Sequence, residues 1–455
     1  MKLTFYGGTK IVTGANYLLD TGKSKILIDC GLFQGSKFAE TLNYEPFQYK
    51  PSEVSFVFLT HGHADHVGRL PKLYKEGFRG KIFATKPTVD ITIKTLPDSL
   101  GLIKDEAKRE GHEPLFDSSD LHNMLSLMAG VDYGQPIEVD GVKITFHDAG
   151  HILGSAILEM EFGDKKGKRS KIYFSGDLGN PPSPLLKLTY FPKDADYLVI
   201  ESAYGARIHE DKSIRKALFD KIIEDTAANG GTLVIPTFAI ERTQELLYEL
   251  DGLFGQGRIP KMPVFLDSPL AIELTQIYKR YMDYFNKETA HVIESGDDIF
   301  NFPGLKFTKS VEESKKINEV KGPKIIMAGS GMSNGGRILY HEQRYLPDPN
   351  STILFVSYQV EGSLGRKLLS GEKKVTILGK SVPVNCKIKA IGGYSGHADQ
   401  EILLKWVKVA NEAEKLKKVF VVQGEENSSS VLAEKILDDQ AIEAVVPSQG
   451  DSFEL

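Results

Sequence analysis

Five short apolar segments of this chain each lead directly to a histidine or a carboxylate. These polar residues are Asp29, His61, His151, Asp177 and Glu201. Short runs rich in β-branched and aromatic side chains are typical of buried strands. Because the ends of neighbouring strands meet at one edge of an α/β sheet, the five side chains are expected to gather there. The pattern therefore favours an α/β fold with a polar centre at a sheet edge.

Three imidazoles and a carboxylate crowd one turn, Thr60-His61-Gly62-His63-Ala64-Asp65-His66. The apolar run 54–59 before it predicts a strand, and the spacing of 67–74 predicts the start of a helix. In an extended segment His61 and His63 point to the same side, since side chains repeat every two residues. Such nitrogen and oxygen donors suit Zn²⁺, with a second cation nearby. Helix capping by Asp65 beside incidental histidines is the weaker alternative, because three of the chain's 11 histidines fall within this turn.

Other strand ends offer further ligands to such a site. His151 follows an apolar strand into a turn, whereas His147 is interpreted as an alternating strand residue. Asp177 could bridge two metal ions. Asp29 is either a turn-forming residue or a carboxylate that orients a histidine or a bound water, and beside a metal site both interpretations stay open.

The composition bounds the class of protein. A chain of 455 residues can form two or three domains, and 41% hydrophobic with 26% charged residues is ordinary for a soluble protein. We find no apolar run approaching the ~18 residues of a membrane span, and no signal peptide. Two cysteines, Cys30 and Cys386, exclude a disulfide framework and favour the cytoplasm. With a net charge of −5, any polyanion must be bound by local positive charge.

Beyond Glu201 the pattern changes to apolar strands alternating with helices, which argues for a parallel sheet covered on both faces. We expect strands at 233–236, 263–267, 324–328 and 352–356, with helices near 240–254 and 269–287. A helix at 399–411 and a last strand–helix–strand unit at 419–446 follow. The basic run 165–171 is interpreted as a solvated hairpin tip.

Two glycine-rich turns and a third arginine follow predicted strands of this region. Glycine allows close backbone approach and arginine adds a forked cation, so each turn could hold a phosphate. Each signal is weak alone, but together they favour phosphate contact. The candidate residues are Arg242, Ser330, Gly331, Met332, Gly335, Gly336, Arg337, Gln359 and Arg366.

The His-x-His-x-Asp-His turn, His151 and Asp177 resemble the metallo-β-lactamase fold. Glu201, the segment Gly331–Arg337 and the segment Ser395-Gly396-His397-Ala398-Asp399 resemble, more narrowly, the β-CASP ribonucleases. These include the endonuclease subunit of the cleavage and polyadenylation factor and its bacterial and archaeal relatives. The resemblance covers residues 3 to about 450.

This resemblance implies an α/β fold, a metallo-β-lactamase αββα sandwich with an inserted parallel-sheet β-CASP domain. The implied domains are 1–205 and 386–455 for the sandwich and 206–385 for the insertion, with the active site in the cleft between them. Two zinc ions are implied. One is held by His61, His63, His151 and Asp177, and the other by Asp65, His66, Asp177 and a residue on the final strand.

That last residue is one of two departures from the family pattern. The family has histidine before Gly-Glu, whereas this chain has Gln423, a neutral and weaker ligand for zinc. Occupancy of the second zinc position is therefore in question. Glu241 stands where the family usually has glycine, which places a negative charge next to Arg242.

The implied function is hydrolysis of phosphodiester bonds in single-stranded RNA, since a narrow cleft excludes a duplex. Asp65, His397 and Glu201 are the implied catalytic residues, with His397 serving the leaving oxygen and Glu201 holding its tautomer. We expect endonucleolytic cleavage, while 5′-exonucleolytic activity stays open. The chain ends soon after its final strand, and lacks an N-terminal KH module, which leans towards a compact endonuclease.

Two other classes remain open. The same histidine turn serves hydrolases of small thioesters, lactams and lactones, although the second domain and its arginine turns exceed what such substrates require. A zinc-impaired RNA-binding protein is the other class, because of Gln423. As partners we expect single-stranded RNA and no membrane, and we allow for a homodimer.

Overall fold

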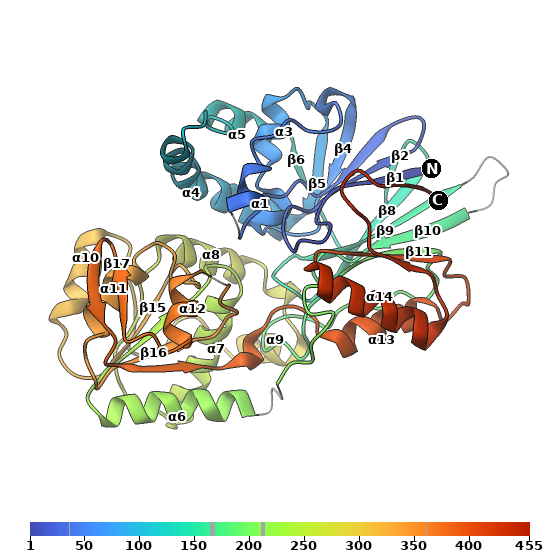
Figure 1. The fold of residues 1–455 in the computed structure, drawn as a ribbon. Helices are drawn as coiled ribbons and strands as arrows, with labels where there is room; N and C mark the ends of the chain where they lie inside the picture. The colour runs from blue at the N-terminus through green and yellow to red at the C-terminus, as the bar shows by residue number, and fades with distance from the viewer. Residues whose placement is uncertain (36, 164–168, 211–213, 361) are drawn as a thin grey trace. The chain divides into compact units, whose positions relative to one another are not determined.

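The computed structural model describes residues 1–35, 37–163, 169–210, 214–360 and 362–455. Most of the basic run predicted as a hairpin tip, residues 165–168, lies outside these ranges. The chain divides into two compact units, which we call the discontinuous unit (Met1–Ile208 with His397–Leu455) and the inserted unit (His209–Gly396) (Figure 1). The predicted domain boundaries at 205/206 and 385/386 stay a prediction.

The first sheet of the discontinuous unit has the strand order β22-β1-β2-β3-β4-β5-β6. Strands β3 to β6 are parallel to one another, and β22, β1 and β2 complete the sheet with antiparallel pairs. The strands are β1 (Lys2–Gly7), β2 (Asn16–Asp20), β3 (Lys25–Ile28), β4 (Val54–Phe58), β5 (Lys81–Thr85), β6 (Met128–Val131) and β22 (Ser452–Glu454).

The second sheet has the order β21-β20-β11-β10-β9-β8-β7. Its neighbours β10, β11, β20 and β21 are parallel, so the strand ends that carry polar residues lie along one edge. The strands are β7 (Ile137–Val139), β8 (Val142–Asp148), β9 (Ala156–Gly163), β10 (Arg169–Phe174), β11 (Tyr197–Glu201), β20 (Lys418–Val422) and β21 (Ala444–Val445).

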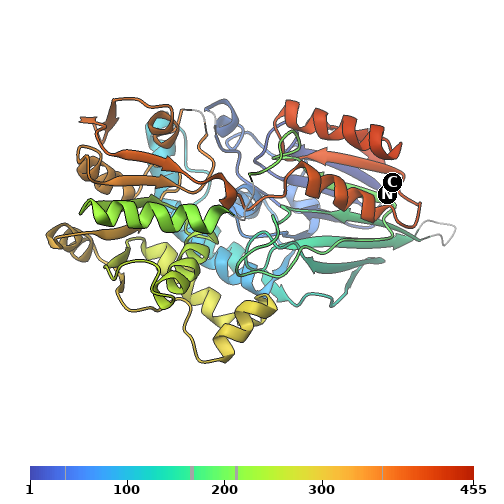
Figure 2. The ribbon, with the colours of Figure 1, turned by 90° about the horizontal axis from the view of Figure 1, so that it is seen from below.

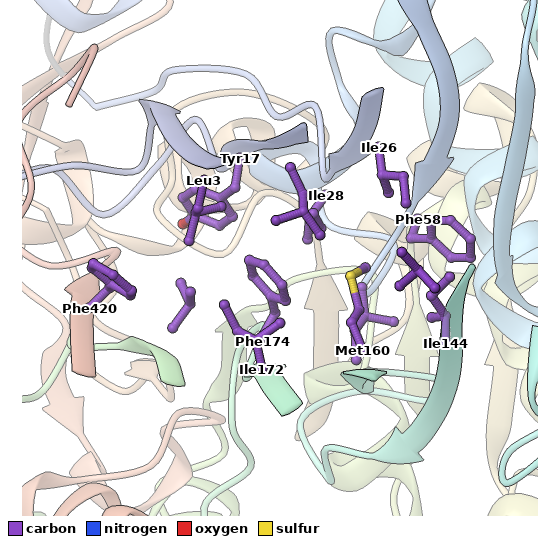
Figure 3. Packing of buried hydrophobic residues seen from close by; sticks show 14 of the residues in the cluster. Leu3, Tyr17, Ile26, Ile28, Phe58, Ile144, Met160, Ile172, Phe174 and Phe420 are labelled. Carbon is purple, nitrogen blue, oxygen red and sulfur yellow. The ribbon is translucent and has the colours of Figure 1, made fainter. Parts of the chain in front are cut away.

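The two sheets pack face to face around one apolar core, seen close up in Figure 3. Leu3, Ile28 and Phe58 of the first sheet contact the same cluster as Met160 and Phe174 of the second. Each of these side chains is at most 1% exposed. Burial of apolar surface contributes roughly 25 cal/mol per Å², so this layer stabilises the pairing of the two sheets.

Helices cover the outer faces of both sheets. Leu70, Leu96 and Met124 pack under the first sheet, and Trp406 and Ile436 pack against the second. Figures 1 and 2 show α13 and α14 side by side on that second sheet. The helices are α1 (Lys37–Thr41), α2 (Ala64–Val67), α3 (Leu70–Lys75), α4 (Lys86–Glu110), α5 (Ser118–Leu125), α13 (Gln400–Ala410) and α14 (Glu426–Gln440). The layers are helix–sheet–sheet–helix, so the predicted αββα sandwich is confirmed.

The inserted unit contains a parallel sheet of order β14-β13-β15-β12-β16-β19, as its apolar strands predict. Between β16 and β19 in the sequence, β17 and β18 form a separate antiparallel hairpin. The strands are β12 (Thr232–Pro236), β13 (Val264–Leu266), β14 (Leu305–Phe307), β15 (Lys324–Ala328), β16 (Thr352–Phe355), β17 (Lys374–Ile377), β18 (Lys380–Pro383) and β19 (Lys387–Ala390).

The helices of this unit are shorter than the sequence suggests in one place. The helix expected near 269–287 is wrong in length, because it ends at Arg280 and a second helix begins at Lys287. The helices are α6 (Arg215–Ala228), α7 (Arg242–Gly255), α8 (Pro269–Arg280), α9 (Lys287–Glu294), α10 (Val311–Lys316), α11 (Ile338–Tyr345) and α12 (Leu364–Leu369). In the described ranges we find no helix long and apolar enough to span a membrane.

Candidate metal centre

Four side chains of the discontinuous unit converge at the ends of its strands. They are His61 and His63 after β4, His151 between β8 and β9, and Asp177 after β10, and one ligand atom of each lies within 4.8 Å of the others. His63 Nδ1 is 3.0 Å from His61 Nε2 and 3.3 Å from His151 Nε2. Asp177 Oδ2 is 3.4 Å from His61 Nε2 and 3.6 Å from His151 Nε2. The structure therefore brings together the four residues predicted for one zinc ion.

These separations suit a tetrahedral ion. A tetrahedron with ligands at about 2.0–2.1 Å has edges of roughly 3.3–3.4 Å, and three imidazoles with one carboxylate are a common zinc set. Burial, followed by neighbouring imidazoles, lowers the pKa of His61, His63 and His151, so each can offer a lone pair. Burial opposes ionisation of Asp177, but His66, His61 and His397 hold its pKa well below its usual range. The donor set fits zinc in geometry and in protonation.

The backbone of the histidine turn is fixed by the loop that follows β3. The Cys30 amide donates to the His66 carbonyl at 2.7 Å, and the Leu32 amide donates to the Ala64 carbonyl at 2.9 Å. A Cβ at Gly31 would come within 1.5 Å of the Asp65 carbonyl oxygen, so this close approach requires glycine. The turn that carries the ligands is thus held by the end of the neighbouring strand.

A second group of side chains shares Asp177. Its members Asp177, Glu201 and His397 also have ligand-type atoms within 4.8 Å of one another. His397 Nδ1 lies 3.2 Å from Glu201 Oε2 and 3.8 Å from Asp177 Oδ2. Burial disfavours the imidazolium, but Glu201 and then Asp177 raise the pKa of His397 to about 9. The His397 side chain is 27% exposed, so it combines a held proton with access to solvent.

Asp29 contacts the histidine turn through two groups. His66 Nδ1 lies 2.7 Å from Asp29 Oδ2, and Thr60 donates to the same carboxylate through its amide and its hydroxyl, each at 2.8 Å. The Thr60 hydroxyl is also 3.1 Å from His61 Nδ1. Asp29 therefore orients His66 directly. The sequence interpretation missed Thr60, although its place immediately before the first histidine was a usable signal.

The remaining predicted ligands, Asp65, His66 and Gln423, lie on the other side of Asp177. His66 Nε2 is 3.3 Å from Asp177 Oδ1 and 4.0 Å from Asp65 Oδ2. Gln423, directly after β20, places its amide nitrogen 2.8 Å from Asp177 Oδ1 and 2.9 Å from His66 Nε2. Its amide oxygen instead accepts from the Tyr17 hydroxyl at 3.3 Å. Tyr17 had no signal in the sequence beyond its place in a strand.

The inserted unit brings the two glycine-rich turns together. Gln359 is 2% exposed, and its amide nitrogen donates to the Gly331 carbonyl at 2.9 Å. The Gly365 amide donates to the Met332 carbonyl at 3.3 Å. The first turn is closed on itself, since the Ser330 amide donates to the Gly335 carbonyl at 3.1 Å. Gly336 is exposed, so part of this paired surface faces solvent.

The three predicted phosphate-binding arginines differ in their surroundings. Arg337 donates to Asp267, and to the carbonyls of Thr308 and Lys309, at 2.7–3.0 Å. Arg242 is 7% exposed and pairs with Glu245. Arg366 is exposed. Two of the three guanidinium groups are thus engaged in internal contacts, and phosphate binding by these residues stays a prediction.

Glu241, the second departure from the family pattern, has φ of +61°. This left-handed region favours glycine, which explains the usual residue there. The Glu241 carboxylate is buried and accepts from the Tyr278 hydroxyl at 2.5 Å. Its charge is therefore engaged by Tyr278.

Three family descriptions match successive parts of the chain. The metallo-beta-lactamase superfamily matches residues 12–79, and the Beta-Casp domain matches residues 243–368. The Zn-dependent metallo-hydrolase RNA specificity domain matches residues 381–447. Zinc is accordingly the metal of this group of hydrolases.

A full-length relative is Ribonuclease TTHA0252 of Thermus thermophilus, 38% identical over 448 residues that cover 96% of this chain and 100% of the relative. The chain belongs to the β-CASP family of metallo-β-lactamase-fold hydrolases. The β-CASP relatives also include Transcription termination factor FttA of Methanocaldococcus jannaschii, at 31% identity over 96% of this chain and 69% of the relative. FttA of Methanosarcina mazei is likewise 31% identical, over 97% of this chain and 70% of the relative.

A solved structure supports the fold. A protein of unknown function from Enterococcus faecalis matches with a TM-score of 0.56, covering 100% of this chain and 99% of its own. Its sequence identity is 14%, so the likeness concerns the fold alone.

Proposed function

We propose that this chain is a zinc-dependent ribonuclease that hydrolyses phosphodiester bonds of single-stranded RNA. The observation that carries the proposal is the set His61, His63, His151 and Asp177, whose ligand atoms face one another at zinc-like separations. The match to an RNA specificity domain and the relative named a ribonuclease support RNA as the substrate. A hydrolase of small thioesters or lactones would need neither.

A bound zinc ion would lower the pKa of water from 15.7 to roughly 7 and so supply a nucleophile at neutral pH. His61, His63, His151 and Asp177 would hold that ion. The partly exposed carboxylate of Asp65 lies beside His66 at the edge of the same site and would accept a hydrogen bond from the attacking water. These residues together place the nucleophile.

His397 carries the proton that the departing oxygen needs. With a pKa raised to about 9 its imidazole is protonated at neutral pH, and it is partly open to solvent. Glu201 accepts from Nδ1, which leaves the Nε2 proton for the substrate. Glu201 is itself fixed, because the Leu178 amide donates to its Oε1 at 2.6 Å. The pair therefore forms a positioned general acid.

Contacts to the RNA backbone belong to the proposal as well. The exposed Arg366 and the turn of Ser330, Gly331, Met332, Gly335 and Gly336 offer a cation and backbone amides of the kind that bind phosphate. We further propose endonucleolytic cleavage, a cytoplasmic location and a homodimer that size measurements in solution can check. The two-ion expectation depends on Gln423.

The decisive variant is His397→Ala. Cleavage of an end-labelled single-stranded RNA should fall by about 10²–10⁴-fold, the usual contribution of a general acid, while bound zinc stays constant. Glu201→Gln is the matched control, since it keeps the shape but weakens the hold on the imidazole, and it should give a smaller loss. Internal fragments from the unmodified chain indicate an endonuclease, and mononucleotides indicate an exonuclease.

Three results would count against this function. Loss of zinc in His397→Ala would make His397 a ligand or a structural residue. RNA binding without turnover in the unmodified chain under saturating zinc would favour a non-catalytic RNA-binding protein. Hydrolysis of a thioester or lactone in place of RNA would favour the small-molecule class.

A further inference from the structure

Gln423 lies where a second cation of this family would need a ligand, and the structure gives its side chain a different use. The residue is 3% exposed and directly follows β20. Its amide nitrogen faces Asp177 Oδ1 at 2.8 Å and His66 Nε2 at 2.9 Å. The amide donates an N–H to the Asp177 carboxylate, and an amide nitrogen offers no lone pair to a cation.

The ring of His66 is held through its other nitrogen. Asp29 Oδ2 accepts from His66 Nδ1 at 2.7 Å, and the same carboxylate is fixed by Thr60. His66 Nε2, on the other side of the ring, lies 3.3 Å from Asp177 Oδ1 and 2.9 Å from the Gln423 amide nitrogen. The Gln423 amide nitrogen is therefore within hydrogen-bond distance of two atoms that a second cation would need, His66 Nε2 and Asp177 Oδ1.

Tyr17 meets the other end of the amide. Its hydroxyl donates to Gln423 Oε1 at 3.3 Å, on the side away from Asp177. Gly8 supports the same arrangement, since its carbonyl accepts from the Gln423 amide of the main chain at 2.7 Å. Reversing the side-chain amide would set its oxygen against Asp177 Oδ1, an unfavourable contact between two acceptors.

We propose that the Gln423 side-chain amide takes the place of the second zinc ion, so that this enzyme binds one zinc, at His61, His63, His151 and Asp177. The residues of the second position do not fit a cation, because the Gln423 amide nitrogen, which is no zinc ligand, donates to Asp177 Oδ1 and lies 2.9 Å from His66 Nε2. Because the amide occupies Asp177 Oδ1, this carboxylate serves a single metal. The inference rests on the first zinc site of the proposed function.

The test compares zinc content in the unmodified chain, in Gln423→His and in Gln423→Glu. Each protein is saturated with zinc, passed over a chelating resin and measured by elemental mass spectrometry. We expect about one zinc per chain in the unmodified protein and about two in both variants, because imidazole and carboxylate are zinc ligands and the amide nitrogen is not. Gln423→Glu nearly preserves size, so it isolates the exchange of a donor for a ligand.

Two further measurements guard against a folding defect. Without metal, Gln423→Glu sets a carboxylate against Asp177 and should lower the melting temperature, which zinc should restore. Tyr17→Phe frees the amide and should let a second zinc bind at lower free zinc than in the unmodified chain. In the cobalt-substituted forms, magnetic coupling between ions should appear in Gln423→His and not in the unmodified chain.

The failures are distinguishable. Two zinc ions in the unmodified chain would overturn this inference and leave the proposed function standing, with Gln423 a ligand through its oxygen. One ion in all three proteins would also overturn it, since the amide would then not be what excludes the second ion. No zinc in any of them would overturn the first site and with it the proposed function.

Discussion

Asp177 in the discontinuous unit and Asp267 in the inserted unit are both buried carboxylates just past a strand, and both face histidine. Charged groups and hydroxyl groups of the protein donate hydrogen bonds to both carboxylate oxygens of Asp267. It accepts from Arg337 and from His341 Nε2, both at 2.7 Å. Asp177 is instead approached by imidazole nitrogens and by one amide.

The difference separates a structural ion pair from a candidate metal centre. Burial opposes ionisation of Asp267, but His341, Ser314 and Arg337 lower its pKa to about 2, so its charge is fully balanced within the fold. The imidazoles of His61, His63 and His151 point lone-pair atoms at the space beside Asp177. Convergent acceptors of this kind need a cation, whereas the Asp267 cluster needs none.

Asp177→Asn gives the largest expected effect. Removing a direct carboxylate ligand should weaken zinc binding by more than the roughly 10–100-fold that loss of an outer partner costs, and RNA cleavage should disappear with the metal. Zinc affinity is measured by competition with a chelating dye. Asp267→Asn is the matched control and should keep its zinc. Equal affinity in the two variants would mean that Asp177 is not a ligand.

Asp267→Asn should act on stability instead. The change leaves Arg337 without its buried partner, and breaking such a pair costs about 3–5 kcal/mol. Urea unfolding followed by circular dichroism should show a destabilised transition. Fluorescence of Trp406, the single tryptophan, reports the discontinuous unit, and its transition should move much less. A shift confined to the tryptophan signal would contradict the assignment of Asp267 to an independent network.

The sequence was informative where function restricts residue type and spacing. The turn that carries His61 and His63 located the candidate metal centre, and apolar runs located the strands of both units. The sequence did not predict which partner a polar side chain hydrogen-bonds to when several are within reach. Nothing in local pattern shows that Arg337 turns inward to Asp267, or that Tyr17 meets Gln423 across 406 residues of sequence.

The sequence also did not predict unusual backbone conformations or the positions of helix ends. Glu241 adopts a left-handed φ that its residue type does not announce. The predicted helix 269–287 stops at Arg280 because tertiary packing, and not helix propensity, sets where the chain turns. Such features depend on contacts distant in sequence, which a single sequence does not reveal.

Glu342 in α11 is a further buried carboxyl, and it sharpens the contrast because, among the described residues, it belongs neither to the candidate metal centre nor to an ion pair. It is 0% exposed, and Ser333 donates to its Oε1 at 2.5 Å. Its Oε2 has no hydrogen-bond partner among the residues that the structure describes. Burial raises the pKa of Glu342 to about 8, so this carboxyl is protonated in the folded protein at neutral pH.

Glu342→Gln should therefore stabilise the inserted unit in a pH-dependent way. In the unfolded chain the carboxyl ionises near pH 4.5, whereas the folded chain keeps the proton up to about pH 8. Between these values the unfolded state binds fewer protons, so the stability of the unmodified protein falls as pH rises. Glutamine does not titrate. The variant should match the unmodified protein near pH 4.5 and exceed it by about 4 kcal/mol at pH 8, measured by urea unfolding across this range. A difference that does not change with pH would show that Glu342 is ionised in the fold, as Asp267 is.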